Sequence, residues 1–280
     1  MPERPAADGY QPTLPLLLGH ALVFLWRDRM VFALVALPVA GLAAGIDWIL
    51  EDNALFIGWR NHWGWDFLFA LVYAMFLDRW IKESLLENAY ECEEVEEFRR
   101  SLIAPRFLFY AAVMFVVAYA LSVFPTDWFF GPESVAWLAP GRFFAILLPW
   151  LPHLVFWSLI LALFCLVLPS VSAAEPLTLG EALRLGRAQR AVLIKLILVV
   201  AFLSLVGYAL SHWGLQHLPR KAWAAAATTA AHRLFDCLLI AITGNCLATI
   251  YSQITDWRQP ESADHPYRGL GKPPRRFPSV

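Results

Sequence analysis

The sequence predicts an all-α integral membrane bundle of about six transmembrane helices, with amphipathic interfacial helices on the cytoplasmic side. Two features of its composition lead to this prediction. Of the 280 residues, 59% are hydrophobic and 16% are charged, against roughly 25% charged in an ordinary soluble domain. The apolar residues also form runs long enough to cross a hydrocarbon layer, which takes about 20 residues of helix.

Six apolar runs are predicted to span the membrane, at about 30–50, 63–83, 107–124, 143–168, 191–212 and 230–251. The second run is interrupted near its ends by Asp66, Asp78 and Arg79, although its core, FLFALVYAMFL, is apolar throughout. We therefore expect one six-helix membrane domain over residues 1–258. Residues 259–280 are rich in Pro and charge and cannot bury enough apolar surface to fold alone, which predicts a disordered cytoplasmic tail.

The Lys and Arg residues predict the orientation, because positive residues near helix ends stay on the cytoplasmic side. One side of the predicted spans carries most of them, including the groups within 79–106, 184–195 and 258–276. The other side carries only Arg60, Arg142, Arg220 and Lys221. Both termini are thus expected in the cytoplasm. The first residues, MPERPAADGYQP, lack the regions of a signal peptide, so the first span is expected to be an uncleaved anchor.

The segment TLGEALRLGRAQR predicts an amphipathic helix on the cytoplasmic surface. Thr178 followed three residues later by Glu181 is the pattern of a capping box, which marks a helix start. Leucines supply one face and arginines the other, as in interfacial helices. The apolar residues are Leu179, Leu183 and Leu185, and the basic residues are Arg184, Arg187 and Arg190.

The segment before the first span resembles this one, which suggests an internal repeat. Aligning GHALVFLWRDR with GEALRLGRAQR pairs Gly19 with Gly180, Ala21 with Ala182, Leu22 with Leu183 and Arg29 with Arg190. An apolar span follows each segment. Internal duplication is common in membrane folds, but sequences of low complexity also align by chance. A third segment, EEFRRSLIAPR, matches only at Arg106.

Several function classes have no support in the sequence. A net charge of −1 offers no basic surplus for nucleic acid. Motifs of hydrolases, nucleotide-binding enzymes and zinc proteases are missing, and no cofactor is expected. The cysteines form no Cys-x-x-Cys pair and are expected to be free thiols; they are Cys92, Cys165, Cys237 and Cys246.

Ionisable residues at membrane depth are costly and are the remaining candidates for a functional site. His153 follows Pro149 and Pro152 in the predicted fourth span, where prolines free backbone carbonyls and permit a kink. It could handle a proton or a substrate. The other interpretation is a neutral histidine that is hydrogen-bonded to a neighbouring helix.

A second candidate is the group His232, Arg233 and Asp236 in the last span. Arg233 and Asp236 are three residues apart on one helical face, where they can form an ion pair. The alternative is that Arg233 binds an anionic lipid headgroup or solute, together with Asp47 or Asp66. Thr243 and Asn245, deeper in the same helix, are expected to hydrogen-bond between helices.

Two further groups contain possible metal ligands, and neither has the pattern of a metal site. The outer-loop histidines, His62, His212 and His217, have no ligand spacing that a helix or turn would enforce. The acidic stretch from Glu87 to Arg100 offers carboxylates but no Gly turn or Asp-rich loop. The expected structure of that stretch is a solvated helical face.

The segment LVLPSVSAAEPLTLGEALRLGRAQR resembles a broad group of uncharacterised bacterial multi-helix membrane proteins, related to the membrane domain found beside glycerophosphodiester phosphodiesterases. Its matching positions are Leu168, Pro169, Leu179, Glu181, Ala182 and Leu185. A second similar element is FLDRWIKESLLENAY, with Leu85 and Leu86, and the resemblance extends over 14–255. The acidic stretch around Cys92 departs from the pattern. The resemblance implies a six-helix module of the bacterial inner membrane, without the phosphodiesterase domain or its hydrolase activity.

These observations favour a non-enzymatic, multi-pass membrane protein. It would bind or move a small molecule or lipid, or support a protein partner of unknown identity. Its expected contacts are the lipid bilayer and an anionic lipid or small solute. The alternatives are a lipid-acting membrane enzyme and an assembly subunit. An enzyme would bring an acid, a base and a nucleophile together, whereas a binding protein requires a polar cavity.

Overall fold

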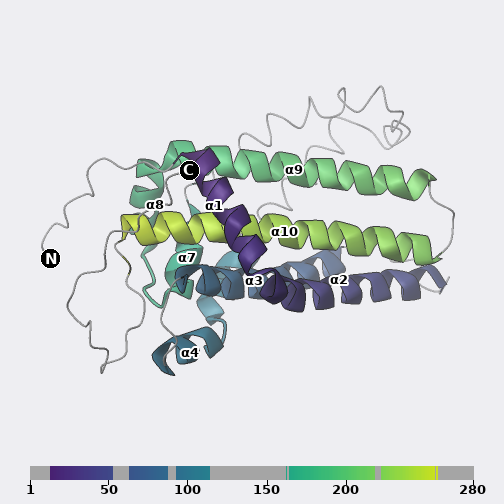
Figure 1. Cartoon of the computed structure of the whole chain (residues 1–280), viewed down its shortest axis with the longest axis horizontal. Coiled ribbons are helices and arrows are strands. Elements are labelled where there is room, and N and C mark those ends of the chain that lie inside the picture. The colour runs from purple at the N-terminus through teal and green to yellow at the C-terminus, as the bar shows by residue number, and fades with distance from the viewer. Residues whose placement is uncertain are drawn as a thin grey trace, which may run out of the picture.

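The computed structural model describes residues 13–52, 63–87, 93–113, 162, 164–217, 222–255 and 257. Every regular element in these ranges is a helix, which confirms the all-α prediction for this part of the chain. Figure 1 shows, in chain order, α1 (Leu14–Arg27), α2 (Arg29–Asp52), α3 (Trp63–Leu85), α4 (Glu93–Arg100), α7 (Val167–Ser172), α8 (Leu179–Ala188), α9 (Arg190–His217) and α10 (Ala222–Ile254). Residues 105–113 are also helical.

Helix α10 is the central element of the bundle, with α2, α3 and α9 packed along it (Figure 1). Its buried residues join three apolar clusters. Ala241 packs with residues of α2 and α3, Leu247 with residues of α9, and Tyr251 with residues of α3 and α7. The short helices α4, α7 and α8 lie near the last turns of α10 (Figure 1), and we call this the α8 end of the bundle.

Two glycines set how closely the long helices approach. A Cβ atom on Gly244 of α10 would lie 2.9 Å from Leu77 Cδ1 of α3, and one on Gly207 of α9 would lie 2.6 Å from the ring of Phe235. Such close approach through small residues is typical of helix packing in membranes, where dispersion contacts replace the hydrophobic effect.

Four of the six predicted spans coincide with long helices. The runs at 30–50, 63–83, 191–212 and 230–251 correspond to α2, α3, α9 and α10. The run at 107–124 is described only as far as residue 113 and is helical there. The run at 143–168 lies mostly outside the described residues, and its end is a turn that leads into the short, buried α7.

Within the described residues, one helical segment, Ala226–Ile254, combines the length and the hydropathy needed to cross a membrane. Its 29 residues exceed the roughly 20 that a bilayer requires. A single such helix is weak evidence of membrane association, because core helices of soluble proteins have the same properties. These helices therefore do not support a count of six spans, and that count stays a prediction. The predicted tail, 259–280, lies outside the described residues.

Helices α1 and α2 are separated by one residue, and so are α8 and α9. Asp28 and Gln189 occupy the two breaks with similar backbone angles, φ −99° and ψ 25° against φ −105° and ψ 14°. The Asp28 N–H donates to Phe24 O, and the Gln189 N–H donates to Leu185 O. In the predicted alignment these residues are equivalent. The shared geometry supports the internal repeat, in which a short helix breaks at one residue and a long helix follows.

Helix α8 begins as the sequence predicts. The Thr178 hydroxyl accepts from the Glu181 N–H at 3.3 Å, and the Glu181 carboxylate accepts from the Thr178 N–H at 2.9 Å, which completes the capping box. The predicted basic face, Arg184, Arg187 and Arg190, is exposed. Whether the predicted apolar residues Leu179 and Leu183 contact lipid stays a prediction.

The buried residues of α8 are the small Ala182 and Gly186. Leu185 packs against the apolar cluster that contains Leu193 of α9, while Leu179 is half exposed. Ala182 packs in the cluster that includes Val171 of α7 and Tyr251 of α10. Leucine periodicity alone does not reveal which side of a short helix has a neighbour.

The capping box makes the first turn of α8 sensitive to acid. Hydrogen bonds from the Thr178 N–H and hydroxyl hold the pKa of Glu181 below its ordinary value. The stabilisation is therefore fully present above the ordinary carboxyl pKa and is lost as the pH falls through the lowered pKa. Amide-exchange protection factors of Glu181 and Ala182 should be constant near neutral pH and fall on acidification. Glu181→Gln should show no such pH dependence; an equal fall in that variant would contradict this origin.

Candidate functional site

A buried ion pair on α3 forms the polar centre of the α8 end. Asp78 and Lys82 are four residues apart, so they share a helical face, and Lys82 Nζ lies 2.9 Å from Asp78 Oδ2 with each side chain 5% exposed. Ser172 of α7 donates its hydroxyl to Asp78 Oδ1 at 2.7 Å. Lys82 also donates to the Ser101 carbonyl at 3.0 Å. The pair thereby connects α3 to α7 and to the segment 101–104.

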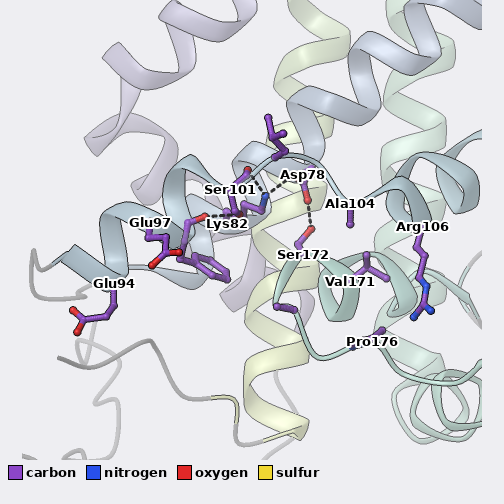
Figure 2. A pocket seen from close by; sticks show the side chains of 13 residues that line it. Asp78, Lys82, Glu94, Glu97, Ser101, Ala104, Arg106, Val171, Ser172 and Pro176 are labelled. Atoms are coloured by element: carbon purple, nitrogen blue, oxygen red, sulfur yellow. Dashed lines mark hydrogen bonds and ion pairs between the residues drawn. The ribbon is translucent and has the colours of Figure 1, made fainter. Parts of the chain in front are cut away.

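A cavity of about 550 Å³ adjoins this pair. Figure 2 shows Asp78, Lys82 and Ser172 joined by their contacts, with Glu94 and Glu97 to one side and Arg106 to the other. Phe98, Leu102, Ala104, Val171 and Pro176 supply much of the remaining wall. The volume falls within the roughly 300–1,000 Å³ typical of small-molecule sites. The cavity is therefore lined by the Asp78–Lys82 ion pair, with acidic residues on one side and a basic residue on the other.

The third segment compared above, EEFRRSLIAPR, differs from the other two at residues 101–104. In the first two units one residue separates the short helix from the long helix, whereas four residues separate α4 from the helix at 105–113. These four residues contribute the Ser101 carbonyl that binds Lys82 and two side chains of the cavity wall. The longer break thus contributes part of the cavity wall.

The opposite wall follows the end of α7. The Ala174 N–H donates to Val171 O and the Glu175 N–H donates to Ser170 O, with Ala174 at a φ of 58°. This pairing is a Schellman motif, in which a left-handed residue ends the helix. It turns the chain sharply, so that Pro176 lies over the cavity.

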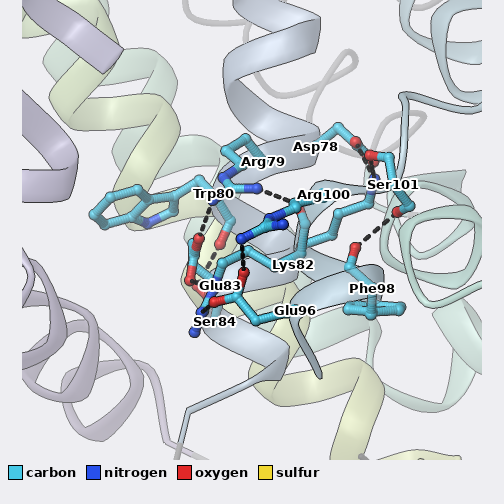
Figure 3. A network of polar contacts seen from close by, with 11 residues as sticks. Asp78, Arg79, Trp80, Lys82, Glu83, Ser84, Glu96, Phe98, Arg100 and Ser101 are labelled. Atoms are coloured by element: carbon cyan, nitrogen blue, oxygen red, sulfur yellow. Dashed lines mark hydrogen bonds and ion pairs between the residues drawn. The ribbon is translucent and has the colours of Figure 1, made fainter. Parts of the chain in front are cut away.

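Salt bridges hold α4 against α3 (Figure 3). Glu83 of α3 pairs with Arg79 at 2.8 Å and with Arg99 of α4 at 3.3 Å. Glu96 pairs with Arg99 and with Arg100, each at 2.8 Å, and Arg79 donates to the Arg99 carbonyl. The acidic residues of α4 are exposed or partly exposed, as the predicted solvated face requires, while Val95 on the other side of the helix is fully buried. No cluster of three metal-binding side chains occurs among the described residues.

The structure brings together the predicted group of His232, Arg233 and Asp236, and Tyr73 of α3 joins it. Arg233 Nη1 lies 3.8 Å from Asp236 Oδ2, which confirms the expected ion pair, and His232 Nε2 lies 3.7 Å from the same oxygen. Tyr73 of α3 donates its hydroxyl to Asp236 at 3.1 Å and accepts from Arg233 at 3.5 Å. Tyr73 is far away in the sequence and no local pattern identified it.

Other predicted candidates lie outside what the structure describes. His153 and His62 are outside the described residues, and so are the side chains of Asp47, Asp66, His212 and His217. Whether Arg233 acts together with Asp47 of α2 or Asp66 of α3, and what role His153 plays, therefore stay predictions.

Asn245 forms the interhelical contacts that the sequence predicts. Its Nδ2 donates to Ser84 Oγ of α3 at 3.2 Å, and its Oδ1 lies 3.2 Å from His20 Nδ1 of α1. His20 Nε2 in turn lies 3.1 Å from Glu87 Oε2. The prediction is wrong for Thr243, whose hydroxyl donates to Leu239 O of its own helix. The sequence alone does not single out His20, which connects α1 to Asn245 of α10 and to Glu87 just after α3.

No protein-family model, curated protein or solved structure matches the chain. The resemblance to the membrane domain beside glycerophosphodiester phosphodiesterases therefore stays a prediction from the sequence.

Proposed function

We propose that this protein is a non-enzymatic, multi-pass protein of the bacterial inner membrane that binds a small molecule or lipid headgroup at the α8 end of its bundle. The observation that carries the proposal is the cavity beside the Asp78–Lys82 pair. Both groups already have partners within hydrogen-bond distance. They are thus suited to shape a site and hold its walls together, and less suited to exchange protons with a substrate.

The surface of α1 and α2 supports a membrane location. Large apolar side chains there are 57–77% exposed; they are Val23, Trp26, Met30, Leu34 and Leu37. Contiguous apolar surface of this kind is unfavourable in water and marks an interaction or membrane surface. In a bilayer these side chains would contact acyl chains at no such cost.

The charge distribution supports a cytoplasmic location for the α8 end. The basic residues of α4 and α8 and those at the end of α3 lie there, as the retention of positive charge in the cytoplasm requires. With α10 ending at the same place, the C-terminus would be cytoplasmic as well. Lipid phosphates would then face Arg184, Arg187 and Arg190 of α8.

Topology gives a direct prediction. Reporter fusions at Val280 and near Gln11 should both report the cytoplasm, because an even number of spans returns the chain to its starting side. A fusion in the segment 218–221, between α9 and α10, should report the opposite side and serves as the internal control. One terminus outside would require an odd span count and would contradict the proposed architecture.

A cavity-filling variant tests the binding function. Ala104 lines the cavity, so Ala104→Trp should occupy its space and lower the amount of co-purified ligand at least tenfold. Ala191→Trp, at an exposed position of α9, is the matched control and should leave it unchanged. Native mass spectrometry of protein extracted together with its lipids measures both. A wild-type protein that carries no molecule sensitive to Ala104→Trp would refute a binding function and favour an assembly subunit.

A further inference from the structure

We propose that protonation of His20 controls the docking of helix α1 on the bundle, so that α1 is held while the imidazole carries both protons and is released as the pH rises. This inference goes beyond the proposed binding function and does not depend on it. It is carried by a hydrogen-bond network in which both ring nitrogens of His20 face oxygen acceptors on other parts of the chain.

His20 lies on the face of α1 that packs against the bundle, where α1 crosses α10 (Figure 1). Leu17, Ala21 and Phe24 share this face, because they are three or four residues from His20, and each is at most 2% exposed. The His20 side chain is 22% exposed. It is therefore part of the contact between helices and still within reach of protons from the solvent.

The proton on the first ring nitrogen follows from the hydrogen bonds of Ser84. The Ser84 hydroxyl donates to Trp80 O at 2.8 Å, so its single proton is used and its oxygen can only accept. Asn245 therefore presents Nδ2 to Ser84 Oγ and Oδ1 to His20 Nδ1, each at 3.2 Å. Since the amide oxygen is an acceptor, His20 Nδ1 must carry a proton.

The second ring nitrogen faces a carboxylate. His20 Nε2 lies 3.1 Å from Glu87 Oε2, and Arg27 Nη1 donates to Glu87 Oε1 at 3.1 Å, which favours the ionised carboxylate. A carboxylate only accepts, so Nε2 must carry a proton as well. A neutral imidazole has a single N–H. Whichever tautomer it adopts, one nitrogen lone pair would then face an oxygen lone pair.

The other charged groups around the network leave this requirement in place. Arg27 Nη2 pairs with Asp28 at 3.1 Å, so the network of His20, Arg27, Asp28 and Glu87 has two positive and two negative charges. Loss of the His20 proton leaves an excess negative charge at Glu87, whose side chain is 11% exposed. The described charged residues of α8 and α9 are exposed, and those at the end of α3 pair with one another or with α4; they are Glu181, Arg184, Arg187, Arg190 and Lys195, and Asp78, Arg79, Lys82 and Glu83.

The direction of the pH effect follows from linkage. The docked state makes two hydrogen bonds to the protonated imidazole, so it binds this proton more tightly than the undocked state does, and the proton in turn favours docking. The stabilisation is present at acidic pH and is lost as the pH rises through the range in which the imidazole titrates, which for histidine in peptides is near about 6.5. Release of α1 would uncover Trp80 of α3, whose ring centroid lies 5.5 Å from that of Phe24.

Thiol accessibility in the full chain, reconstituted into nanodiscs, tests the inference. Leu17→Cys places a thiol on the buried face of α1, and Val23→Cys places one at a position that is 69% exposed. Iodoacetamide reacts with the thiolate, so the ratio of the two alkylation rates cancels the intrinsic pH dependence of the reagent. This ratio should rise at least tenfold between about pH 5.5 and 8.5, the effect of losing a hydrogen bond to a charged group. Mass spectrometry of the peptides separates these thiols from the native cysteines.

Variants of the network identify the group that titrates. In the background of His20→Gln, which cannot titrate, the ratio should be constant with pH. Glu87→Gln should move the midpoint to lower pH by about one unit or more, because it removes the carboxylate that favours the imidazolium. His232→Gln, at the other described histidine side chain, is the matched control and should behave as the wild type does.

A second measurement needs no substitution on the buried face of α1. Nitrogen NMR of histidine-labelled wild-type protein at about pH 6 should show one imidazolium signal, protonated at both nitrogens, that is missing from His20→Gln. A rate ratio that does not change with pH in the otherwise unaltered chain, or that changes equally in His20→Gln, would overturn the inference. So would a neutral His20 in the NMR spectrum. None of these results bears on the cavity, whose binding function is tested separately by Ala104→Trp.

Discussion

Lys82→Met is expected to lower the free energy of unfolding by about 3–5 kcal/mol, the cost of breaking a buried ion pair by removal of one partner. Lys82 supplies the only cation bonded to Asp78 among the described contacts, and the carboxylate is 5% exposed. Without the lysine, Asp78 retains the hydroxyl of Ser172 and no compensating charge. Methionine preserves the length of the apolar stem, so the loss reports the charge rather than the packing.

The double variant Asp78→Asn with Lys82→Met should recover most of this loss. A neutral amide can still accept from Ser172, and no unpaired charge remains buried. Arg100→Met is the matched control, because Arg100 pairs with Glu96 at 2.8 Å while its side chain is 79% exposed, and exposed pairs contribute about 0–1 kcal/mol. Denaturant titrations followed by circular dichroism measure all three. A Lys82→Met variant no less stable than Arg100→Met would show that the pair is accessible to water.

Trp80→Ala is expected to cost about 3–5 kcal/mol, the usual range for removal of a buried tryptophan. The Trp80 side chain is 1% exposed, and its ring contacts residues of three helices. Its ring centroid lies 5.5 Å from that of Phe24 in α1, 5.9 Å from Phe32 in α2 and 6.0 Å from Phe76 in α3. The substitution leaves a cavity where these helices meet, and thermal unfolding in detergent micelles should report the loss.

Trp26→Ala is the matched control for this prediction. Trp26 is 73% exposed and lies under the guanidinium group of Arg29. Its removal forfeits one exposed cation–π contact, worth about 0.5–1 kcal/mol, and leaves no internal void. Equal destabilisation by the two substitutions would place Trp80 at a surface and would argue against the packing of α1 and α2 on α3.

The cavity also gives the internal repeat a functional consequence. The breaks at Asp28 and Gln189 are single residues, whereas the four-residue break after α4 lines the proposed site. If an ancestral unit was duplicated, the third copy has acquired its function through a longer connection. Shortening the segment 101–104 should accordingly remove ligand retention before it removes the fold.

The features that the sequence alone predicts correctly are those with a short-range cause. The positions of α2, α3, α9 and α10 follow from runs of apolar residues, because every residue of a helix in such a run contributes to the same signal. The start of α8 follows from Thr178 and Glu181, which are three residues apart and bond to each other. The Arg233–Asp236 pair is of the same kind, since one helical turn brings both side chains together.

The features that required the tertiary structure join residues far apart in the chain. Asp78 and Ser172 are 94 positions apart, and Tyr73 and Asp236 are 163 apart. The sequence shows Asp78 only as an interruption at the end of an apolar run, and Lys82 only as one of many basic residues on one side. Their role depends on which helix faces α3 at that depth. Local patterns determine that a helix forms, but the fit of side chains between helices selects its neighbours, and only that selection places α4, α7 and the segment 101–104 around one cavity.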